Sequence, residues 1–415
     1  MRARQSGSIR RAPLLTALLA GIAGLVGTAT TLAATDATPF PRSVAIAPQP
    51  STSGALAVAN LDSQIEWVRR TAHAAGDPAT ARQLADLLLQ RSTFMGTYDD
   101  LDELRLLSGV DVERHPHDPA AWLGRAAFLT AVHRFDGARA ALVRAEAAGA
   151  EAELVDRARW VVDLATGVDP DRLVERARHR RRAEPSLQSW ADEAHALAAA
   201  GRFEEADLAY RAAQARYRDV SPFPLAWLAF QRGVMWAESA DRPDLAAPLY
   251  REALRYLPGH VAAGVHLAEL EASAGDLPGA VGRLRSLARG TGDPEPMARL
   301  AEYLAGAEPE EAARAAAAAR ARYAVLLAKH RAAFLDHAAE FHSGPGGDAA
   351  LGLLLARENL ALRPTVRAYH VAIVAARAGR HTGTACDLAT RAASLQGRSP
   401  VLAALIAQVE TACVR

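Results

Sequence analysis

The feature that most constrains this chain is a pair of short helical segments, joined by a tight turn, that recurs along the sequence. The stretch "PAAWLGRAAFLTAVHRFDGARAALVRAEA" is one such pair. Trp122 and Ala126 lie four residues apart in its first half, and Ala138 and Leu142 have the same spacing in its second half. Residues four apart share a helix face. The stretch therefore predicts two amphipathic helices with "RFD" at the turn between them.

The pattern returns at a nearly constant interval. Thirty-four residues separate Gly167 from Gly201, and the same number separates Ala246 from Ala280. The interval from Ala206 to Ala246 is longer, at 40 residues, because extra residues occur around "RDVSPFP". A repeat of this length indicates units that cannot bury their apolar faces alone and therefore stack on their neighbours.

These repeats resemble the tetratricopeptide repeat (TPR) family. The segments "GRFEEADLAYRAA" and "APLYREALRYLPG" carry its Gly-x-Phe turn and its Ala, Tyr, Ala and Pro positions. The resemblance covers residues 77–400, good in four units and approximate in the others. It implies an all-α fold, namely a right-handed α-solenoid of stacked helix-turn-helix repeats. Runs of Val, Ile and Thr that would form strands are almost missing, which agrees with that fold class.

The first residues differ from the rest of the chain. Four arginines, at positions 2, 4, 10 and 11, precede the apolar run "APLLTALLAGIAGLVG", which small residues follow. This order is typical of an export signal. Residues 1–37 are therefore predicted to be a signal peptide, with an uncleaved N-terminal membrane anchor as the alternative. In either case the body is predicted to be exported, either periplasmic, secreted or tethered outside the cytoplasm.

The remaining boundaries follow from composition. The Pro- and Ser-rich segment 38–54 predicts a flexible linker. Residues 55–398 hold the repeats, and residues 399–415 are predicted to form a C-terminal capping helix. In that helix Ser399 is the expected N-cap and Pro400 the first helical residue.

The TPR resemblance implies that the first helix of each unit lines a concave inner face, where peptides usually bind. The family's carboxylate clamp of Lys and Asn side chains is absent, because Lys329 is the only lysine and Asn60 and Asn359 are the only asparagines. The matching positions predict instead a largely aromatic groove for an apolar or helical segment of a protein partner. Trp227 and Phe334 are its preferred members. The alternative, that these side chains fill the core between helices, stays open. The groove positions are His195, Trp227, Phe230, Phe334, His337, Phe341 and Tyr369.

Nothing in the sequence predicts a catalytic centre. There is no G-x-S-x-G or P-loop pattern and no stretch left over for a catalytic domain. The densest histidine cluster is "HRAAFLDHAAEFH", but His330, His337 and His342 place no two ligands on adjacent helical turns. The net charge of +1 does not favour nucleic acid. The chain is therefore predicted to be no enzyme, with no cofactor, no metal and no nucleic-acid partner.

The two cysteines lie near the C-terminus. Cys386 and Cys413 flank the "GRS" turn at similar distances along the two helices that it joins. A disulfide that fixes the cap and a pair of buried free thiols are equal alternatives, and export to an oxidising compartment is compatible with the bridge.

Two functions are open at this stage. The leading prediction is a non-enzymatic extracytoplasmic TPR scaffold that binds a protein or peptide in its concave groove. The alternative is an accessory or sensing module that binds a small ligand or metal near residues 330–342.

Overall fold

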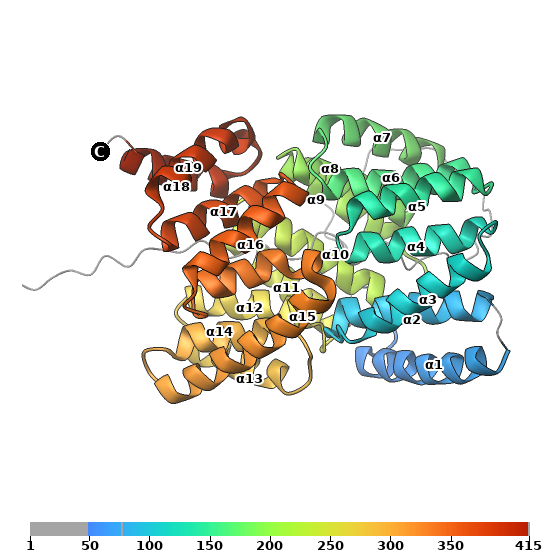
Figure 1. Cartoon of the computed structure of the whole chain (residues 1–415), viewed down its shortest axis with the longest axis horizontal. Helices are drawn as coiled ribbons and strands as arrows, with labels where there is room; N and C mark the ends of the chain where they lie inside the picture. The colour runs from blue at the N-terminus through green and yellow to red at the C-terminus, as the bar shows by residue number, and fades with distance from the viewer. Residues whose placement is uncertain (1–48, 76–77, 414–415) are drawn as a thin grey trace, which may run out of the picture.

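The structure is a computed structural model that describes residues 49–75 and 78–413. The predicted export segment 1–37 and residues 38–48 of the predicted linker lie outside the described residues. Those that are described fold into α-helices with two short helical extensions and no strand (Figure 1). The all-α prediction is therefore confirmed.

Nineteen α-helices follow one another through the described ranges, and most successive ones pack as pairs. Their bounds are α1 (Gly54–Ala75), α2 (Pro78–Met95), α3 (Asp100–Arg114), α4 (Pro119–Ala131), α5 (Phe135–Ala147), α6 (Ala152–Ala165), α7 (Pro170–Ala183), α8 (Leu187–Ala199), α9 (Phe203–Arg216), α10 (Pro222–Val234), α11 (Pro243–Tyr256), α12 (Val261–Ser273), α13 (Leu277–Ala288), α14 (Glu295–Leu304), α15 (Pro309–Ser343), α16 (Ala349–Leu362), α17 (Val366–Ala378), α18 (Thr382–Ala392) and α19 (Pro400–Cys413).

Local sequence explains where these helices begin. The side chain of Asp118 accepts a hydrogen bond from the Ala120 amide at 2.9 Å, and Pro119 occupies the first helical position of α4. Ser186 and Ser189 form a capping box at the start of α8. Such caps satisfy amide groups that have no partner inside the helix.

Small residues let the two helices of a unit approach closely. The alanines that recur in the second helix of the repeats, Ala138, Ala206, Ala246 and Ala280, are all fully buried. Gly233 of α10 shows the same requirement, because a Cβ there would lie 2.5 Å from the ring of Tyr250 in α11. The repeat pattern is therefore a packing pattern, as predicted.

The second half of the solenoid lies against the first, which the repeat pattern does not predict. Turns of the first half contact connections that lie 195 to 199 residues further along the chain. In Figure 1 the early helices (blue to green) lie on one side and the late ones (orange to red) on the other. The inner face is thereby enclosed. The contacting positions are Gly96 with Thr291 and Asp293, His133 with Ala332, Gly167 with Pro364, and Gly201 with Arg398.

Two helices depart from regular geometry near this enclosed region. α10 continues into a π-helical turn, η1 (Met235–Ser239), which carries the fully buried Glu238. α15 is interrupted at His330, whose backbone angles (φ −136°, ψ 49°) are not helical. The part of α15 after His330 therefore acts as the first helix of the next unit and holds most of the segment 330–342.

The described end of the predicted linker is held in place. Gln49 donates its backbone amide to the Tyr256 hydroxyl at 3.2 Å and its side-chain amide to the Gln214 carbonyl at 2.9 Å. The Thr52 amide donates to the Val220 carbonyl at 2.7 Å. The predicted flexible linker, residues 38–54, therefore does not extend over residues 49–53, because polar groups of this segment form hydrogen bonds with the solenoid.

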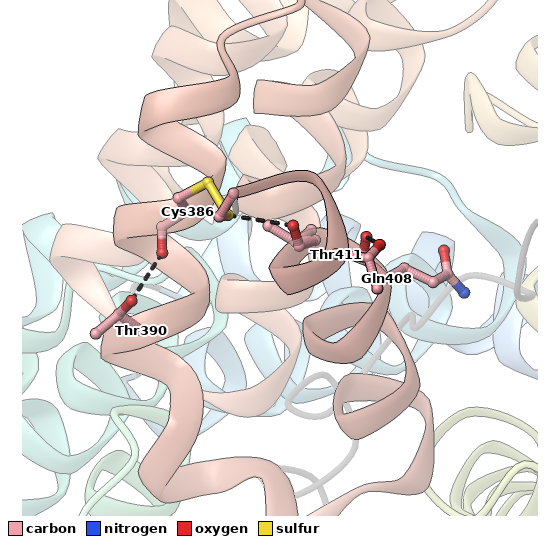
Figure 2. Close-up of a disulfide and its surroundings, with 6 residues drawn as sticks. Cys386, Thr390, Gln408 and Thr411 are labelled. Carbon is pink, nitrogen blue, oxygen red and sulfur yellow. Dashed lines mark hydrogen bonds between the residues drawn. A yellow bond between two sulfur atoms is a disulfide. The ribbon is translucent and has the colours of Figure 1, made fainter. Parts of the chain in front are cut away.

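The C-terminal helix is tied down at both ends. At its start the Ser399 hydroxyl accepts from the Leu402 amide at 3.3 Å and donates to the Ser239 carbonyl of η1 at 3.1 Å, so the predicted N-cap is present. At its end a disulfide joins Cys413 to Cys386 of α18, with the two Cα atoms 6.0 Å apart (Figure 2). A short 3₁₀ turn, η2 (Ala393–Arg398), precedes α19, and α19 closes the stack.

Candidate functional site

The side chains predicted to line an aromatic groove are buried. Trp227 is 7 % and Phe334 6 % exposed, and even His337, the most accessible of the seven, has only 15 % of its side chain exposed. These side chains therefore pack between helices, which is the alternative to an open groove that the sequence left open. The other four residues that were predicted to line the groove are also buried; they are His195, Phe230, Phe341 and Tyr369.

The structure divides these residues among three environments. In α8 and α10, the rings of His195 and Trp227 lie 5.1 Å apart, and Phe230 contacts His260 at 4.9 Å. Phe341 and Tyr369 belong to a separate apolar core of the last units. Phe334 and His337 line an internal pocket.

That pocket, here called the central pocket, has a volume of about 130 Å³ and lies where the early helices α2–α4 meet α12, α14 and α15. Its walls are mixed in character, with apolar side chains on one part and ionisable ones on another. Mixed lining of this kind is common in sites that bind small molecules. The polar lining residues are Ser92, Thr93, Tyr98, His133, His266, Asp293, Glu295, Tyr323, Asp336, His337 and Arg363.

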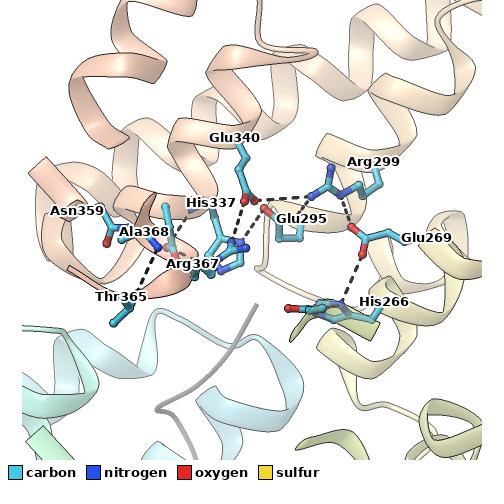
Figure 3. A network of polar contacts seen from close by, with 12 residues as sticks. His266, Glu269, Glu295, Arg299, His337, Glu340, Asn359, Thr365, Arg367 and Ala368 are labelled. Atoms are coloured by element: carbon cyan, nitrogen blue, oxygen red, sulfur yellow. Dashed lines mark hydrogen bonds and ion pairs between the residues drawn. The ribbon is translucent and has the colours of Figure 1, made fainter. Parts of the chain in front are cut away.

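Behind the pocket, ionisable side chains connect consecutive inner helices. Glu238 of η1 lies 2.8 Å from the Nδ1 atom of His266 in α12, and Glu269 of α12 lies 2.7 Å from the Nε atom of Arg299 in α14 (Figure 3). Arg299 also approaches Glu340 of α15 at 3.9 Å. We call this chain of contacts, from η1 to α17, the charge ladder.

The ladder continues into the pocket wall. Glu295 accepts a hydrogen bond from the Tyr323 hydroxyl and lies 3.3 Å from the Nδ1 atom of His337. Asp336 pairs with Arg363 and, at 3.3 Å, with Arg367 of α17. The Nη2 atom of Arg367 lies 3.0 Å from Glu340. The members of the charge ladder are Glu238, His266, Glu269, Glu295, Arg299, Asp336, His337, Glu340, Arg363 and Arg367.

Burial and neighbouring charge shift the pKa values of these groups in opposite directions. Burial lowers the pKa of His337, but the carboxylates of Asp336 and Glu295 outweigh burial and raise it to about 9. Burial raises the pKa of Glu269 and of Glu340 to about 7, against the influence of nearby arginines. The ladder therefore holds more carboxylates than its cations fully compensate.

One carboxylate of the pocket wall has no cationic partner. Asp293 accepts from the Tyr98 hydroxyl at 3.0 Å and from the Glu295 amide at 2.9 Å, and both donors are neutral. Among the described residues no Lys, Arg or His nitrogen lies within ion-pair distance of it. Burial, with the nearby Glu295, raises the pKa of Asp293 to about 6, and the charge of His337, beyond ion-pair distance, offsets part of this rise.

The three histidines of the segment 330–342 do not converge. His330 pairs with Asp102 at 3.1 Å, His337 with Glu295, and His342 packs its ring 5.1 Å from that of Phe341. Across the part of the chain that the structure describes, no group of three or more His, Cys, Asp or Glu side chains has the arrangement of a metal site. A metal at this segment therefore has no support in the geometry.

Sequence reasoning missed the acidic members of the site that lie outside the histidine cluster, such as Asp293 and Glu269. Asp293 and Tyr98 lie in connections outside the units where the repeat pattern is clear. Glu269 had a usable signal, because it stands in the otherwise apolar helix "VHLAELEAS". An acidic residue on a helix face that the repeat pattern assigns to the interior indicates a buried partner.

Comparisons with known proteins give only distant likenesses, and no argument about this chain rests on them. The chain is similar to a solved structure titled as the APC/C hetero-tetramer Cut9–Hcn1, with 14 % identity, a TM-score of 0.43, and coverage of 85 % of this chain and 73 % of that one. It is also similar to yeast Tom70 (13 %, TM-score 0.32, 86 % and 93 % coverage) and to Naa15/Naa10 bound to HypK-THB (12 %, TM-score 0.29, 86 % and 65 % coverage). No family model and no curated protein matches the sequence. The chain's own consecutive packed helix pairs give it a TPR-like solenoid fold.

None of the helices in the described ranges has the length and apolar character that crossing a membrane requires.

Proposed function

We propose that this chain is an exported, non-enzymatic TPR-like scaffold that binds a protein partner at its N-terminal end rather than in an inner groove. The observation that supports it most is the outer face of α1. Trp67 is 58 % exposed and Leu56 is 54 % exposed on that helix. Eleven residues separate them, so they lie on the same helix face.

The opposite face of α1 shows why this exposure is informative. Ala57, Leu61 and Ile65 point into the solenoid and are buried against α2 and α10. The end helix of a solenoid normally needs a polar outer face for solubility. An exposed tryptophan at that position is typical of a binding contact, since tryptophan is enriched among residues that dominate interface energies.

Export of the chain is part of the same proposal. The N-terminal sequence pattern supports it, and so does the disulfide between Cys386 and Cys413, because disulfides persist mainly in oxidising compartments. Thiol labelling of the denatured, unreduced protein from the exported fraction tests this point. Two reactive thiols would contradict both the bridge and its use as support for export.

The partner-binding proposal is tested by affinity capture from the exported fraction, followed by titration of the captured protein. A Leu56→Ala, Trp67→Ala double variant is expected to weaken binding at least tenfold, because it truncates both exposed side chains. Leu354→Ala is the matched control, since Leu354 is 52 % exposed on α16. If the control and the double variant bind the partner equally well, the N-terminal end is not the docking site.

A second candidate function is favoured by a different observation. The segment 330–342 contributes Phe334, Asp336 and His337 to the central pocket. This supports the binding of a small ligand there, and it gives no support to a metal. Binding to the native state alone must raise the melting temperature, so a thermal-shift screen of small molecules tests this candidate.

A further inference from the structure

The charge of the central pocket limits what it can bind. Its lining holds three carboxylates, those of Asp293, Glu295 and Asp336. Against them stand Arg363 and the protonated His337, which the raised pKa keeps charged at neutral pH. The other two lining histidines stay neutral there, because burial lowers the pKa of His133 to about 3 and that of His266 to about 4. Counted over the lining residues alone, the wall has one carboxylate more than it has cations. Arg299 and Arg367, behind the wall, also pair with Glu295 and Asp336 but not with Asp293.

That excess charge is located on Asp293. Asp336 is paired with Arg363, and Glu295 is paired with His337. Only Asp293 relies on neutral donors, one of which is the Tyr98 hydroxyl at 3.0 Å. A carboxylate can accept about four hydrogen bonds, so Asp293 keeps acceptor capacity for a ligand in the pocket.

The wall also offers two aromatic rings and an apolar surface. Tyr98 and Phe334 both line the pocket and contact each other edge to face, with ring centroids 4.9 Å apart. Leu89, Leu101 and Val265 lie in the same lining. Aromatic faces attract cations, and the apolar wall fits a short hydrocarbon chain.

We propose that the central pocket binds a small organic ammonium ion, with Asp293 as the counter-ion of the ammonium group and the Tyr98 and Phe334 rings and the apolar wall around its hydrocarbon part. This rests on the second candidate function given above, ligand binding at the pocket, and names the ligand's chemistry. A metal ion does not fit, since no described cluster supplies enough ligands. A small anion does not fit either, because the cations of the wall are already engaged by Asp336 and Glu295.

The closing experiment compares three probes of similar size on the full chain near neutral pH. Butylammonium, 1-butanol and butyrate are titrated by calorimetry and by thermal shift at millimolar concentrations. Butylammonium is expected to bind and to raise the melting temperature in a dose-dependent way, at least tenfold more strongly than the alcohol or the acid.

Three variants show whether Asp293 is responsible for butylammonium binding. Asp293→Asn is expected to weaken butylammonium binding at least tenfold without lowering the melting temperature of the free protein, because it removes an uncompensated carboxylate. Asp136→Asn is the matched control, since the Asp136 side chain is fully exposed, and it is expected to bind like the wild type. Tyr98→Phe keeps the ring and frees Asp293 of one donor, so it is expected to bind at least as well as the wild type.

The outcomes separate the two levels of the proposal. If none of the probes binds, both the pocket as a ligand site and its ammonium chemistry are overturned. If 1-butanol or butyrate binds as well as butylammonium, or if Asp293→Asn binds butylammonium normally, the pocket stands as a ligand site and the ammonium assignment falls. If Asp293→Asn does not fold, Phe334→Leu is tested in its place. Normal butylammonium binding by Phe334→Leu would overturn the proposed contact of the ligand with the aromatic rings.

Discussion

Two stretches of the same inner face differ in what they bury. In α8 and α10 the side chains around His195, Trp227 and Phe230 are mainly rings and alkyl groups, and we call this the apolar stretch. The buried charges of these helices, such as Glu193 and Arg232, pair with α7 and α9 and do not line the central pocket. From η1 to α17 the corresponding positions carry the charge ladder, which includes Glu269 and Arg299. Both stretches occupy the interior of one solenoid, so position in the repeat decides burial and does not decide polarity.

The difference indicates where binding chemistry is located. Apolar burial is non-directional and stabilises in proportion to area. Buried charges need exact partners, and replacing them by apolar groups is often neutral or stabilising. The ten ionisable groups of the charge ladder are therefore weak evidence for stability. We relate their position next to the central pocket to the ligand binding proposed above.

The largest effect is expected from breaking the ladder at its centre. Arg299→Met leaves Glu269, Glu295 and Glu340 without their shared cation and should lower the free energy of unfolding by about 3–5 kcal/mol. Urea denaturation measures it. Arg314→Met is the control, because Arg314 is largely exposed and should change stability by less than about 0.5 kcal/mol. A loss below about 1 kcal/mol in Arg299→Met would remove the contrast between the two stretches.

A smaller loss is expected in the apolar stretch. Phe230→Leu keeps an apolar side chain among the rings of Tyr250, His260 and His266 and should cost about 1–2 kcal/mol, since the neighbours fill part of the lost volume. The same denaturation series measures it. A cost equal to that of Arg299→Met would show that both stretches respond to defects in the same way.

Of the two stretches, only the charge ladder is expected to make the free energy of unfolding fall as the pH becomes alkaline. The pKa of His337 is raised from 6.5 to about 9, so its contribution is fully present below pH 6.5 and is lost as pH rises through 9. Unfolding free energy should fall by about 1–3 kcal/mol between neutral pH and roughly pH 10. His337→Asn should flatten that part of the curve, while His195→Asn in the apolar stretch should leave its slope unchanged. An equal slope in wild type and His337→Asn would contradict the assignment.

The smallest effect is expected at the pocket itself. The pKa of Asp293 is raised to about 6, so its ionised form at neutral pH destabilises the free protein. Asp293→Asn should therefore raise the free energy of unfolding by about 1 kcal/mol at neutral pH, and the gain should disappear as the pH falls towards 4. Thermal melts across this pH range measure it. A variant that is less stable than wild type at neutral pH would show that the carboxylate serves the fold.

The repeat pattern predicted the helix pairs and their contacts well. Ala246 had to be small because helices cross there, and Ser399 had to precede a helix because its side chain caps it; both follow from local geometry. The aromatic positions were predicted to be on the inner face, which is where Trp227 and Phe334 lie. The sequence left open whether these rings are exposed or fill the core, because that depends on how neighbouring units pack on one another, and the structure buries them.

What the sequence alone determined is periodic and local: the helices, their caps, the small residues at the crossings and the pairing of neighbours. Only the tertiary structure decided that segments nearly two hundred residues apart meet, and that Tyr98 and Asp293 bond to each other in the wall of a pocket. The physical reason is that stacking is governed by nearest neighbours, whereas closure of the superhelix sums small rotations over many units, and no single repeat encodes that sum.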